Sequence, residues 1–175
     1  MTALYLGIDP GSYGAAFLRD RAGRSWECAD LPTGELSDYA DKLRDLLHYM
    51  VHKPSWGKQS TAVYAAIEKQ TRRPRDSNKG LERTLGAYRI IKEVLKGLGV
   101  EYVEVAPNTW QANLGWRKAL GSTKPWSVKL ATQLYPWPAN PFIGEKGGLK
   151  HGRSDAALMA HYAVGWFQTR KGEKP

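Results

Sequence analysis

Hydrophobic and polar positions change their spacing several times along the chain, and each change predicts a different element. Near the start, short apolar or alternating runs are separated by turn-forming residues, first Pro10-Gly11-Ser12 and then Arg21-Ala22-Gly23. Alternation interrupted by tight turns is typical of antiparallel strands joined as a meander. The sequence therefore predicts strands at 3–9, 13–19 and 24–30.

After the meander, apolar residues recur every three or four positions, which predicts amphipathic helices. A near-continuous apolar run at 61–68 instead predicts a strand buried on both faces, and 101–105 predicts a short last strand. Ser77, and later Ser122 or Thr123, are candidate N-caps, and Pro107 favours a helix start. The expected helices cover 36–50, 77–97, a short stretch from 107, 122–134 and 153–168.

This order of elements indicates an α/β domain with a mixed five-stranded sheet flanked by helices. The antiparallel meander would be followed by parallel strands that are reached through helices. If the first strand is central and 61–68 lies parallel beside it, Asp9 and Glu68 end at one sheet edge, where ligands of open α/β sheets bind. We expect residues 1–175 to form a single domain with a short flexible tail from about residue 169.

Charge and composition narrow the class of protein. The chain carries 26 Lys and Arg against 17 Asp and Glu, a formal net charge of +9. This excess favours a polyanionic partner such as nucleic acid, although a solvated basic surface has the same composition. No apolar run approaches the roughly 20 residues that span a bilayer, so a cytoplasmic protein is expected. Cys28 is alone, which excludes a disulfide framework, and we interpret it as a small apolar strand residue.

Three acidic residues in different settings are the main candidates for chemistry. Asp9 and Glu68 each end an apolar run, and Asp155 opens an alanine-rich helical segment with His151 one turn before it. A carboxylate at the end of a buried strand is unfavourable unless a positive charge lies beside it. Taken singly, these acids could be a turn residue, a salt-bridge partner and a helix N-terminal charge. Taken together, they favour a divalent metal site, because carboxylate oxygens suit Mg²⁺.

These residues belong to motifs that occur in a fixed order along nearly the whole chain. The motifs are Leu6-Gly7-Ile8-Asp9-Pro10-Gly11, Ala66-Ile67-Glu68 and His151-Gly152-Arg153-Ser154-Asp155-Ala156-Ala157-Leu158. In this set the chain resembles the RuvC family of Holliday junction resolvases, particularly its phage-type members. The resemblance implies a ribonuclease H-like fold and a structure-selective endodeoxyribonuclease that resolves four-way or other branched DNA by symmetric nicking. It also implies a phage or prophage origin and action in the cytoplasm of a bacterial host.

The resemblance assigns roles to the site residues. Asp9, Glu68 and Asp155 match the family's acidic metal ligands, and His151 matches a fourth position that is aspartate in some members and histidine in others. Two Mg²⁺ ions per active site would be bound, and Mn²⁺ is expected to substitute. Asp9 would bridge both ions, whereas Glu68 and Asp155 would each hold one. His151 would bind a metal or shuttle a proton, and its offset of four residues from Asp155 leaves these roles open.

Basic residues supply the candidate DNA contacts. One group follows Glu68 in a charged loop that is either solvated or, because it adjoins the proposed metal site, in contact with DNA: Lys69, Gln70, Arg72, Arg73, Arg75 and Lys79. In the family, lysines in a later region approach the DNA backbone, and Lys118 and Lys124 match that region. The tryptophans there are interpreted mainly as core residues, although Trp116 or Trp137 could stack on bases. The basic glycine-rich loop around 144–150 is either a mobile connector or a segment that orders over DNA.

The resemblance also implies a homodimer, because symmetric nicks in a four-way junction need two active sites. The apolar stripe of the helix at 81–98 is a candidate interface, but it could equally be core. Two other functions stay open. One is a nucleotide-binding actin or sugar-kinase-like module, since Gly7-Ile8-Asp9-Pro10-Gly11-Ser12 also resembles a phosphate loop of that superfamily. The other is a catalytically silent protein that binds branched DNA.

Overall fold

A computed structural model describes residues 3–11, 13–52, 62–70, 78–136, 140–170 and 172, apart from the side chains of 78–81. Its centre is a five-stranded sheet in the order β3-β2-β1-β4-β5. The strands are β1 (Ala3–Asp9), β2 (Ala15–Asp20), β3 (Trp26–Asp30), β4 (Ala62–Glu68) and β5 (Glu101–Val105). β1 pairs antiparallel with β2 and parallel with β4, so the predicted meander continues into parallel strands.

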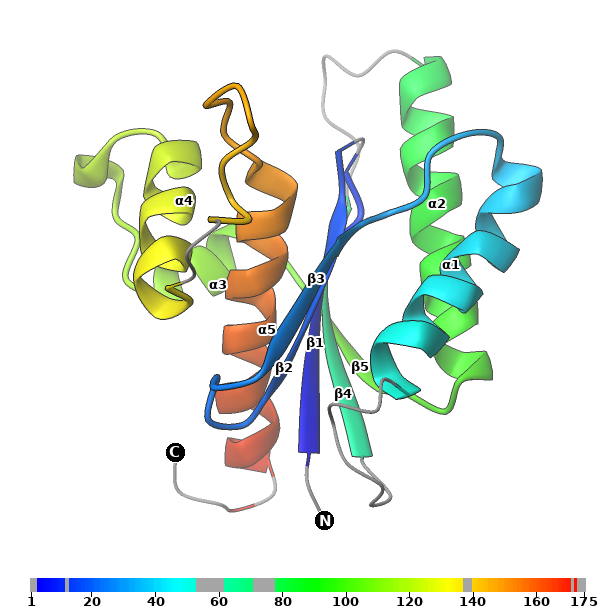
Figure 1. The fold of residues 1–175 in the computed structure, drawn as a ribbon, viewed down its shortest axis with the longest axis horizontal. Helices are drawn as coiled ribbons and strands as arrows, with labels where there is room; N and C mark the ends of the chain where they lie inside the picture. Colours follow the sequence, from blue (N-terminus) through cyan, green and yellow to red (C-terminus); the bar gives the residue numbers. More distant parts are fainter. Residues whose placement is uncertain are drawn as a thin grey trace.

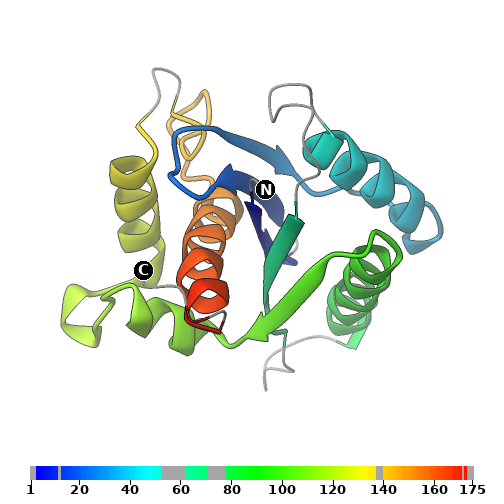
Figure 2. The same cartoon turned by 90° about the horizontal axis from the view of Figure 1, so that it is seen from below.

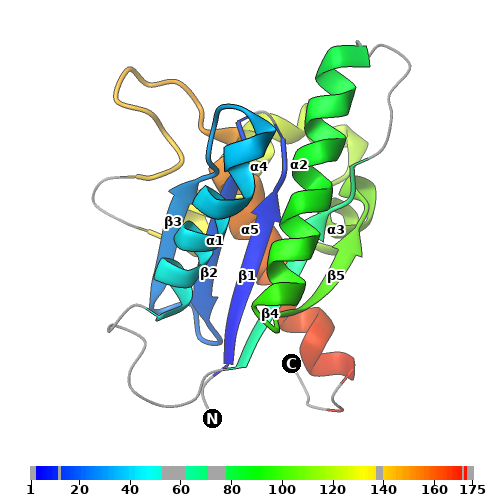
Figure 3. The same cartoon turned by 90° about the vertical axis from the view of Figure 1, so that its right-hand side faces the viewer.

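Helices cover both faces of this sheet, as Figure 1 shows. One face is covered by α1 (Leu36–His52) and α2 (Asn78–Gly97), which stand in front of the sheet in Figure 3. The other face is covered by α5 (His151–Arg170), with α3 (Pro107–Asn113) and α4 (Thr123–Leu134) beyond it; the view from below in Figure 2 separates these layers. A short 3-10 helix, η2 (Lys118–Leu120), joins α3 to α4.

The sequence of β1 explains why it lies in the middle of the sheet. Leu6 and Ile8 pack in the core between the sheet and α1 and α2, whereas Tyr5 packs in the core on the α5 side. Side chains of a strand alternate between its two faces, so a strand that is apolar at every position must be covered on both. Gly7 shares the α5 face with Tyr5.

Gly7 allows α5 to lie directly on β1. A Cβ at this position would be 2.0 Å from the backbone oxygen of Ala156 and 2.3 Å from the backbone nitrogen of Ala160. Gly152 plays the same part at the start of α5, where a Cβ would lie 1.9 Å from the backbone oxygen of Tyr13. The helix is therefore fixed against both β1 and the β1–β2 turn.

Gly7→Ala is expected to destabilise the protein by about 3 kcal/mol, because a methyl group forced into a packed backbone contact displaces the helix. The matched control is Gly165→Ala within α5 itself, where a Cβ would meet nothing within 4 Å. That substitution should stabilise α5 by about 1 kcal/mol through helix propensity. Urea denaturation of both variants measures the two effects, and equal stabilities would contradict the close packing of α5 on β1.

The predicted elements are confirmed, with shifts at several ends. β2 and β3 each begin two residues later than predicted, at Ala15 and Trp26. α5 begins at His151, two residues earlier than predicted, and continues to Arg170, two residues beyond the predicted end. Phe167 and Gln168 are still buried near the end of this helix, which explains why its last turn forms. Ser122 is the N-cap residue of α4 but makes no side-chain capping bond, and Ser77 lies outside the described residues.

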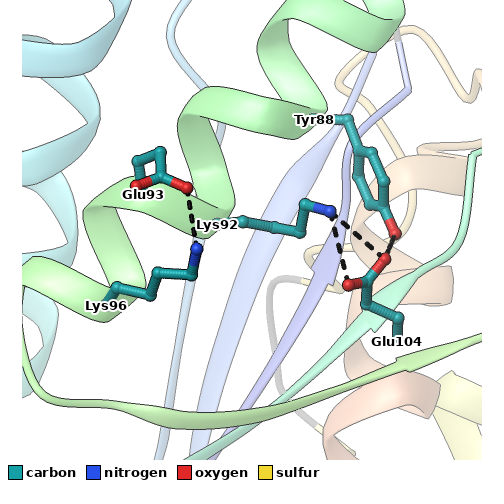
Figure 4. Close-up of polar contacts among 5 residues, drawn as sticks. All are labelled: Tyr88, Lys92, Glu93, Lys96 and Glu104. Atoms are coloured by element: carbon teal, nitrogen blue, oxygen red, sulfur yellow. Dashed lines mark hydrogen bonds and ion pairs between the residues drawn. The ribbon is translucent and has the colours of Figure 1, made fainter.

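The central part of the apolar stripe of α2 is core. Tyr88, Ile91 and Leu95 are buried in the cluster between the sheet and the α1–α2 layer. The Tyr88 hydroxyl donates a hydrogen bond to Glu104 of β5, and Lys92 forms an ion pair with the same carboxylate at 3.3 Å (Figure 4). These contacts tie α2 to the edge strand. A dimer contact through α2 would therefore have to use residues other than these three.

Two further predictions from the sequence concern Cys28 and membrane-spanning helices. Cys28 lies half-buried in β3, and burial raises the pKa of its thiol to about 12, so it is not a reactive thiolate at neutral pH. No helix in the part of the chain that the structure describes combines the length and apolar character needed to cross a membrane.

Candidate active site

Asp9 and Glu68 end neighbouring parallel strands. The register pairs Ile8 of β1 with Ile67 of β4, and these two acids are the next residues on each strand. Ile8 and Ile67 both face the α1–α2 core, so the alternation of strand side chains turns Asp9 and Glu68 toward the α5 face. The strands therefore deliver two carboxylates to one edge and one face of the sheet, as their sequence positions predicted.

Asp155 reaches the same place from α5. It precedes Ala156, the residue whose backbone lies against Gly7, two residues before Asp9 along β1. Burial raises the pKa of Asp155 to about 7; a hydrogen bond from Ser127 and the charge of Lys124 oppose this rise, whereas the nearby charge of Glu68 adds to it. The influence of Glu68 on Asp155 indicates that these two carboxyl groups are electrostatic neighbours.

Glu68 is held by side chains on either side of it. The indole Nε1 of Trp110 donates to Oε2 of Glu68 at 3.0 Å, and the amide of Gln70 lies 3.5 Å from Oε1. Trp110 is completely buried at the end of the first turn of α3 and stacks on Trp126 of α4. Because a rigid donor fixes one oxygen, the orientation of the Glu68 carboxylate is set before any ligand binds.

Asp9 is the last residue of β1 and caps the turn that follows. Its Oδ1 accepts a hydrogen bond from the backbone N–H of Gly11 at 2.9 Å. The turn is closed by a second bond, from the N–H of Gly14 to the oxygen of Gly11 at 2.8 Å. The ordinary interpretation of Asp9 as a turn residue is therefore correct, and it is compatible with a further role, since a carboxylate can accept several bonds.

His151 is the first residue of α5 and is half-buried. Within the described part of the chain, its Nδ1 is buried and has no hydrogen-bond partner. Burial lowers the pKa of this imidazole, and the positive charge of Lys124 lowers it further. A neutral ring nitrogen without a donor beside it can accept a proton or bind a metal, so both roles considered for His151 suit its surroundings.

The donor set fits Mg²⁺ in its chemistry, because Asp9, Glu68 and Asp155 offer hard carboxylate oxygens. Two of them raise each other's energy by charge repulsion, which a bound cation would relieve. In residues 3–11, 62–70, 78–136 and the other described segments, no three Asp, Glu, His or Cys side chains are grouped closely enough to hold one ion. Asp9, which is bonded to the turn after β1, and Glu68, which is bonded to Trp110, are the acids whose side-chain positions are fixed by such contacts.

The predicted DNA-binding residues lie in several places. Lys69 is exposed just after β4, and its backbone N–H donates to the oxygen of Val105 at 2.8 Å. Lys118 is exposed on η2, and Lys124 is exposed in the first turn of α4, close enough to shift the pKa values of Asp155 and His151. Arg72, Arg73 and Arg75 lie outside the described residues, and Lys79 lies in the first turn of α2 without a described side chain.

Gln70 differs from the other residues of this group. It contacts Glu68 through its side chain and is half-buried, so in this structure it is a neighbour of the candidate metal ligand. Among the tryptophans, Trp110 is core as interpreted, Trp116 is half-buried, and Trp137 lies outside the described residues.

Trp110 and Ser127 are site residues that the sequence pattern did not identify. A tryptophan three residues after Pro107 fits the apolar face of a short helix, and nothing in its spacing indicates a carboxylate partner. Ser127 is buried on α4, and its hydroxyl lies 3.2 Å from that of Ser154, the residue before Asp155, but its position in the sequence is that of an ordinary helical residue. Both contacts join segments that are distant in the sequence, so only the folded arrangement brings them together.

Trp110→Phe is expected to weaken Mg²⁺ binding about 10-fold, because the aromatic core is kept while the donor that orients Glu68 is lost. Trp126→Phe is the matched control, since it alters the stacking partner without touching Glu68. Isothermal titration with Mg²⁺ and Mn²⁺ measures the affinities, and thermal denaturation checks that both variants fold equally well. Equal metal affinities in the two variants would contradict an orienting role for Trp110.

Comparisons with known proteins place this arrangement among solved folds. No protein-family model and no curated protein sequence matches the chain. Among solved structures, a complex of Thermus thermophilus RuvC with a Holliday junction substrate is similar, with a TM-score of 0.57 and 15% identity. A second Thermus thermophilus RuvC structure has a TM-score of 0.53 and 17% identity, and in both cases 98% of this chain and 97% of the other are covered. The chain therefore has the fold of these RuvC structures, a ribonuclease H-like mixed sheet flanked by helices, as its motifs predicted.

Proposed function

We propose that this protein is a metal-dependent endonuclease that nicks branched DNA, with four-way junctions as its principal substrate. The observation that carries the proposal is the pair Glu68 and Asp155, two carboxylates from distant segments that interact electrostatically at the sheet edge where Asp9 also ends. Two neighbouring carboxylates repel each other when both are ionised, and a bound cation would relieve this repulsion, which supports a metal site here.

The surroundings of the acids favour a phosphodiester substrate. Lys124 is exposed and close to Asp155, where its ammonium could contact a phosphate next to the carboxylates. The net charge of +9 adds a general attraction for DNA. The residues proposed to contact DNA are Lys69, Gln70, Arg72, Arg73, Arg75, Lys79, Lys118 and Lys124. The protein would act as a homodimer, which presents two active sites to one junction.

In the proposed reaction, Asp9, Glu68 and Asp155 would hold two Mg²⁺ or Mn²⁺ ions, which would activate a water molecule and stabilise the departing oxygen. Trp110 would keep Glu68 in one orientation during the reaction. Lys124 would hold the phosphate, and the unpartnered Nδ1 of His151 would accept or return a proton or serve as a further ligand. The cut would leave a nick in one strand, and the second subunit of the dimer would cut the opposite strand.

The proposal is tested with a panel of synthetic four-way, Y-shaped and linear DNA, each incubated with Mg²⁺, Mn²⁺ or EDTA. We expect paired nicks in the four-way junction with either metal, and no nicks with EDTA. Equal cutting of linear DNA would contradict structure selectivity, and cutting in EDTA would contradict the metal mechanism. ATP turnover without any nicking would instead favour a nucleotide-binding module.

A catalytically silent protein that binds branched DNA is the second candidate. It is favoured by the absence, among the described residues, of three side chains already grouped around one metal position. The same panel separates the two functions: tight binding of the four-way junction without nicks in either metal would establish the silent protein, whereas metal-dependent nicks would exclude it.

A further inference from the structure

The segment before α5 forms a small hairpin. Ile143 and Leu149 pair as an antiparallel bridge, the N–H of Gly144 donates to the oxygen of Gly148 at 2.7 Å, and the N–H of Lys150 donates to the oxygen of Phe142 at 2.8 Å. Gly147 supplies the positive φ of 74° that the turn requires. The glycine-rich stretch is therefore a hydrogen-bonded element and not the plain connector considered from the sequence.

This hairpin is anchored at its base. Phe142 is completely buried and packs against Phe17 of β2, with 6.3 Å between ring centroids. Arg153 lies just beyond the hairpin, donates to the oxygen of Pro141, and forms an ion pair with Asp30 of β3 at 2.6 Å. The two ends of the hairpin are thus fixed to the sheet, and its tip projects at the end of the molecule where α5 begins (Figure 1).

The outer side of the hairpin is apolar. Ile143 and Leu149 are cross-strand partners, so their side chains lie on the same side, opposite to that of the buried Phe142. They are 43% and 42% exposed. Tyr13, in the turn that touches Gly152, is 92% exposed. We call these three side chains the apolar rim; they are half of the large hydrophobic residues exposed in the part of the chain that the structure describes.

The apolar rim borders the candidate active site. Tyr13 follows Asp9 by four residues in the same turn, and the hairpin leads directly into His151 and Asp155. Lys146 and Lys150 are exposed on the hairpin together with the acid Glu145, so the hairpin adds a small net positive charge to this border. Three side chains cover far less than the roughly 800 Å² per partner that a stable subunit interface buries. The combination of a small apolar surface, lysines and a neighbouring carboxylate site fits a nucleic acid better than a second protein.

We propose that the apolar rim contacts unstacked bases at the branch point of DNA, and so gives this site its preference for branched over linear duplexes. The inference rests on the proposed function, in that it assigns the substrate of the same site. A linear duplex shows phosphates and sugars to the outside while its base faces are stacked, so exposed isoleucine, leucine and tyrosine side chains gain little from it. An unstacked base offers an apolar face, against which aliphatic and aromatic side chains pack.

The test compares binding of two variants to a four-way junction, single-stranded DNA and a linear duplex, in Ca²⁺ or EDTA so that nicking does not interfere. The double variant Ile143→Thr/Leu149→Thr places a β-branched residue, which favours extended backbone, at both bridge positions and removes most of the apolar surface. We expect it to bind the junction and the single strand about 10-fold more weakly, with duplex binding unchanged. The second variant, Lys146→Gln/Lys150→Gln, should lower the salt dependence of binding to all three DNAs.

The matched control is Tyr49→Ser on α1, a tyrosine that is 57% exposed on the opposite face of the sheet, and it should bind all three DNAs like the wild type. Unchanged junction binding by the threonine variant, or an equal loss on the duplex, would overturn the inference. A change of molecular mass in sedimentation with unchanged DNA binding would also overturn it, since the rim would then be a subunit contact. If the wild type binds junctions without nicking them, the proposed nuclease function is wrong. The binding data still test the role of the apolar rim, because they do not depend on nicking.

Discussion

Asp9→Asn and Glu68→Gln are each expected to abolish metal-dependent nicking of a four-way junction while leaving junction binding close to that of the wild type. Each change keeps the size of the side chain and removes one carboxylate charge from the candidate metal site. Loss of an outer partner of a metal ligand already costs about 10- to 100-fold, so loss of a ligand should exceed about 100-fold. Binding should survive because it depends on lysine and arginine contacts with phosphates.

The measurement is a single-turnover nicking assay beside a binding titration on the same DNA. Glu101→Gln is the control, because Glu101 is an exposed acid at the far end of the edge strand β5 and should behave like the wild type in both assays. Wild-type nicking rates in either active-site variant would remove these acids from the reaction. Loss of junction binding together with nicking would indicate a folding defect or a direct DNA contact, and thermal denaturation would separate the two.

Asp155→Asn is expected to stabilise the metal-free protein at pH 8. Burial raises the pKa of Asp155 from its ordinary value of 3.8 to about 7 in the folded state, and the charge of Glu68 contributes. The folded state therefore keeps the proton to higher pH than the unfolded state. The stabilising contribution is complete below about pH 4 and is lost as the pH rises through about 7.

The size of this effect follows from the shift of the pKa. Each unit corresponds to about 1.4 kcal/mol, so ionisation of Asp155 should cost the fold about 4 kcal/mol at pH 8, a cost that asparagine avoids. Urea denaturation in EDTA at pH 4 and pH 8 measures it, with a large gain for the variant only at pH 8. Asp45→Asn, at an exposed position on α1, is the control and should show no such gain.

Mg²⁺ should reduce this difference in stability. If Asp155 is a metal ligand, as proposed, the folded wild type gains stability by mass action when the cation binds, whereas the variant lacks that ligand. At pH 8 the gap between the two proteins should therefore narrow as Mg²⁺ is added. A variant that is no more stable than the wild type in EDTA at pH 8 would show that ionisation of Asp155 does not destabilise the folded state.

The order of elements and the fold were predictable because they depend on local patterns. The period of apolar residues separated strands from helices, and turn residues such as Pro10 and Gly11 marked their ends. Since consecutive elements follow a few connection rules, the mixed sheet with β1 beside β4 also followed. The motifs that contain Asp9, Glu68 and Asp155 then indicated the ribonuclease H-like fold.

The sequence by itself determined the strands and helices, the sheet edge at which Asp9 and Glu68 end, and the basic character of the protein. Only the tertiary structure decided that Gly7 admits α5 onto β1, that Trp110 donates a hydrogen bond to Glu68, and that the hairpin presents Ile143 and Leu149. Periodicity records which side of an element is buried, because burial repeats with the geometry of the backbone. It does not record which distant residue fills the space opposite, because that depends on the close packing of side chains from several elements at once.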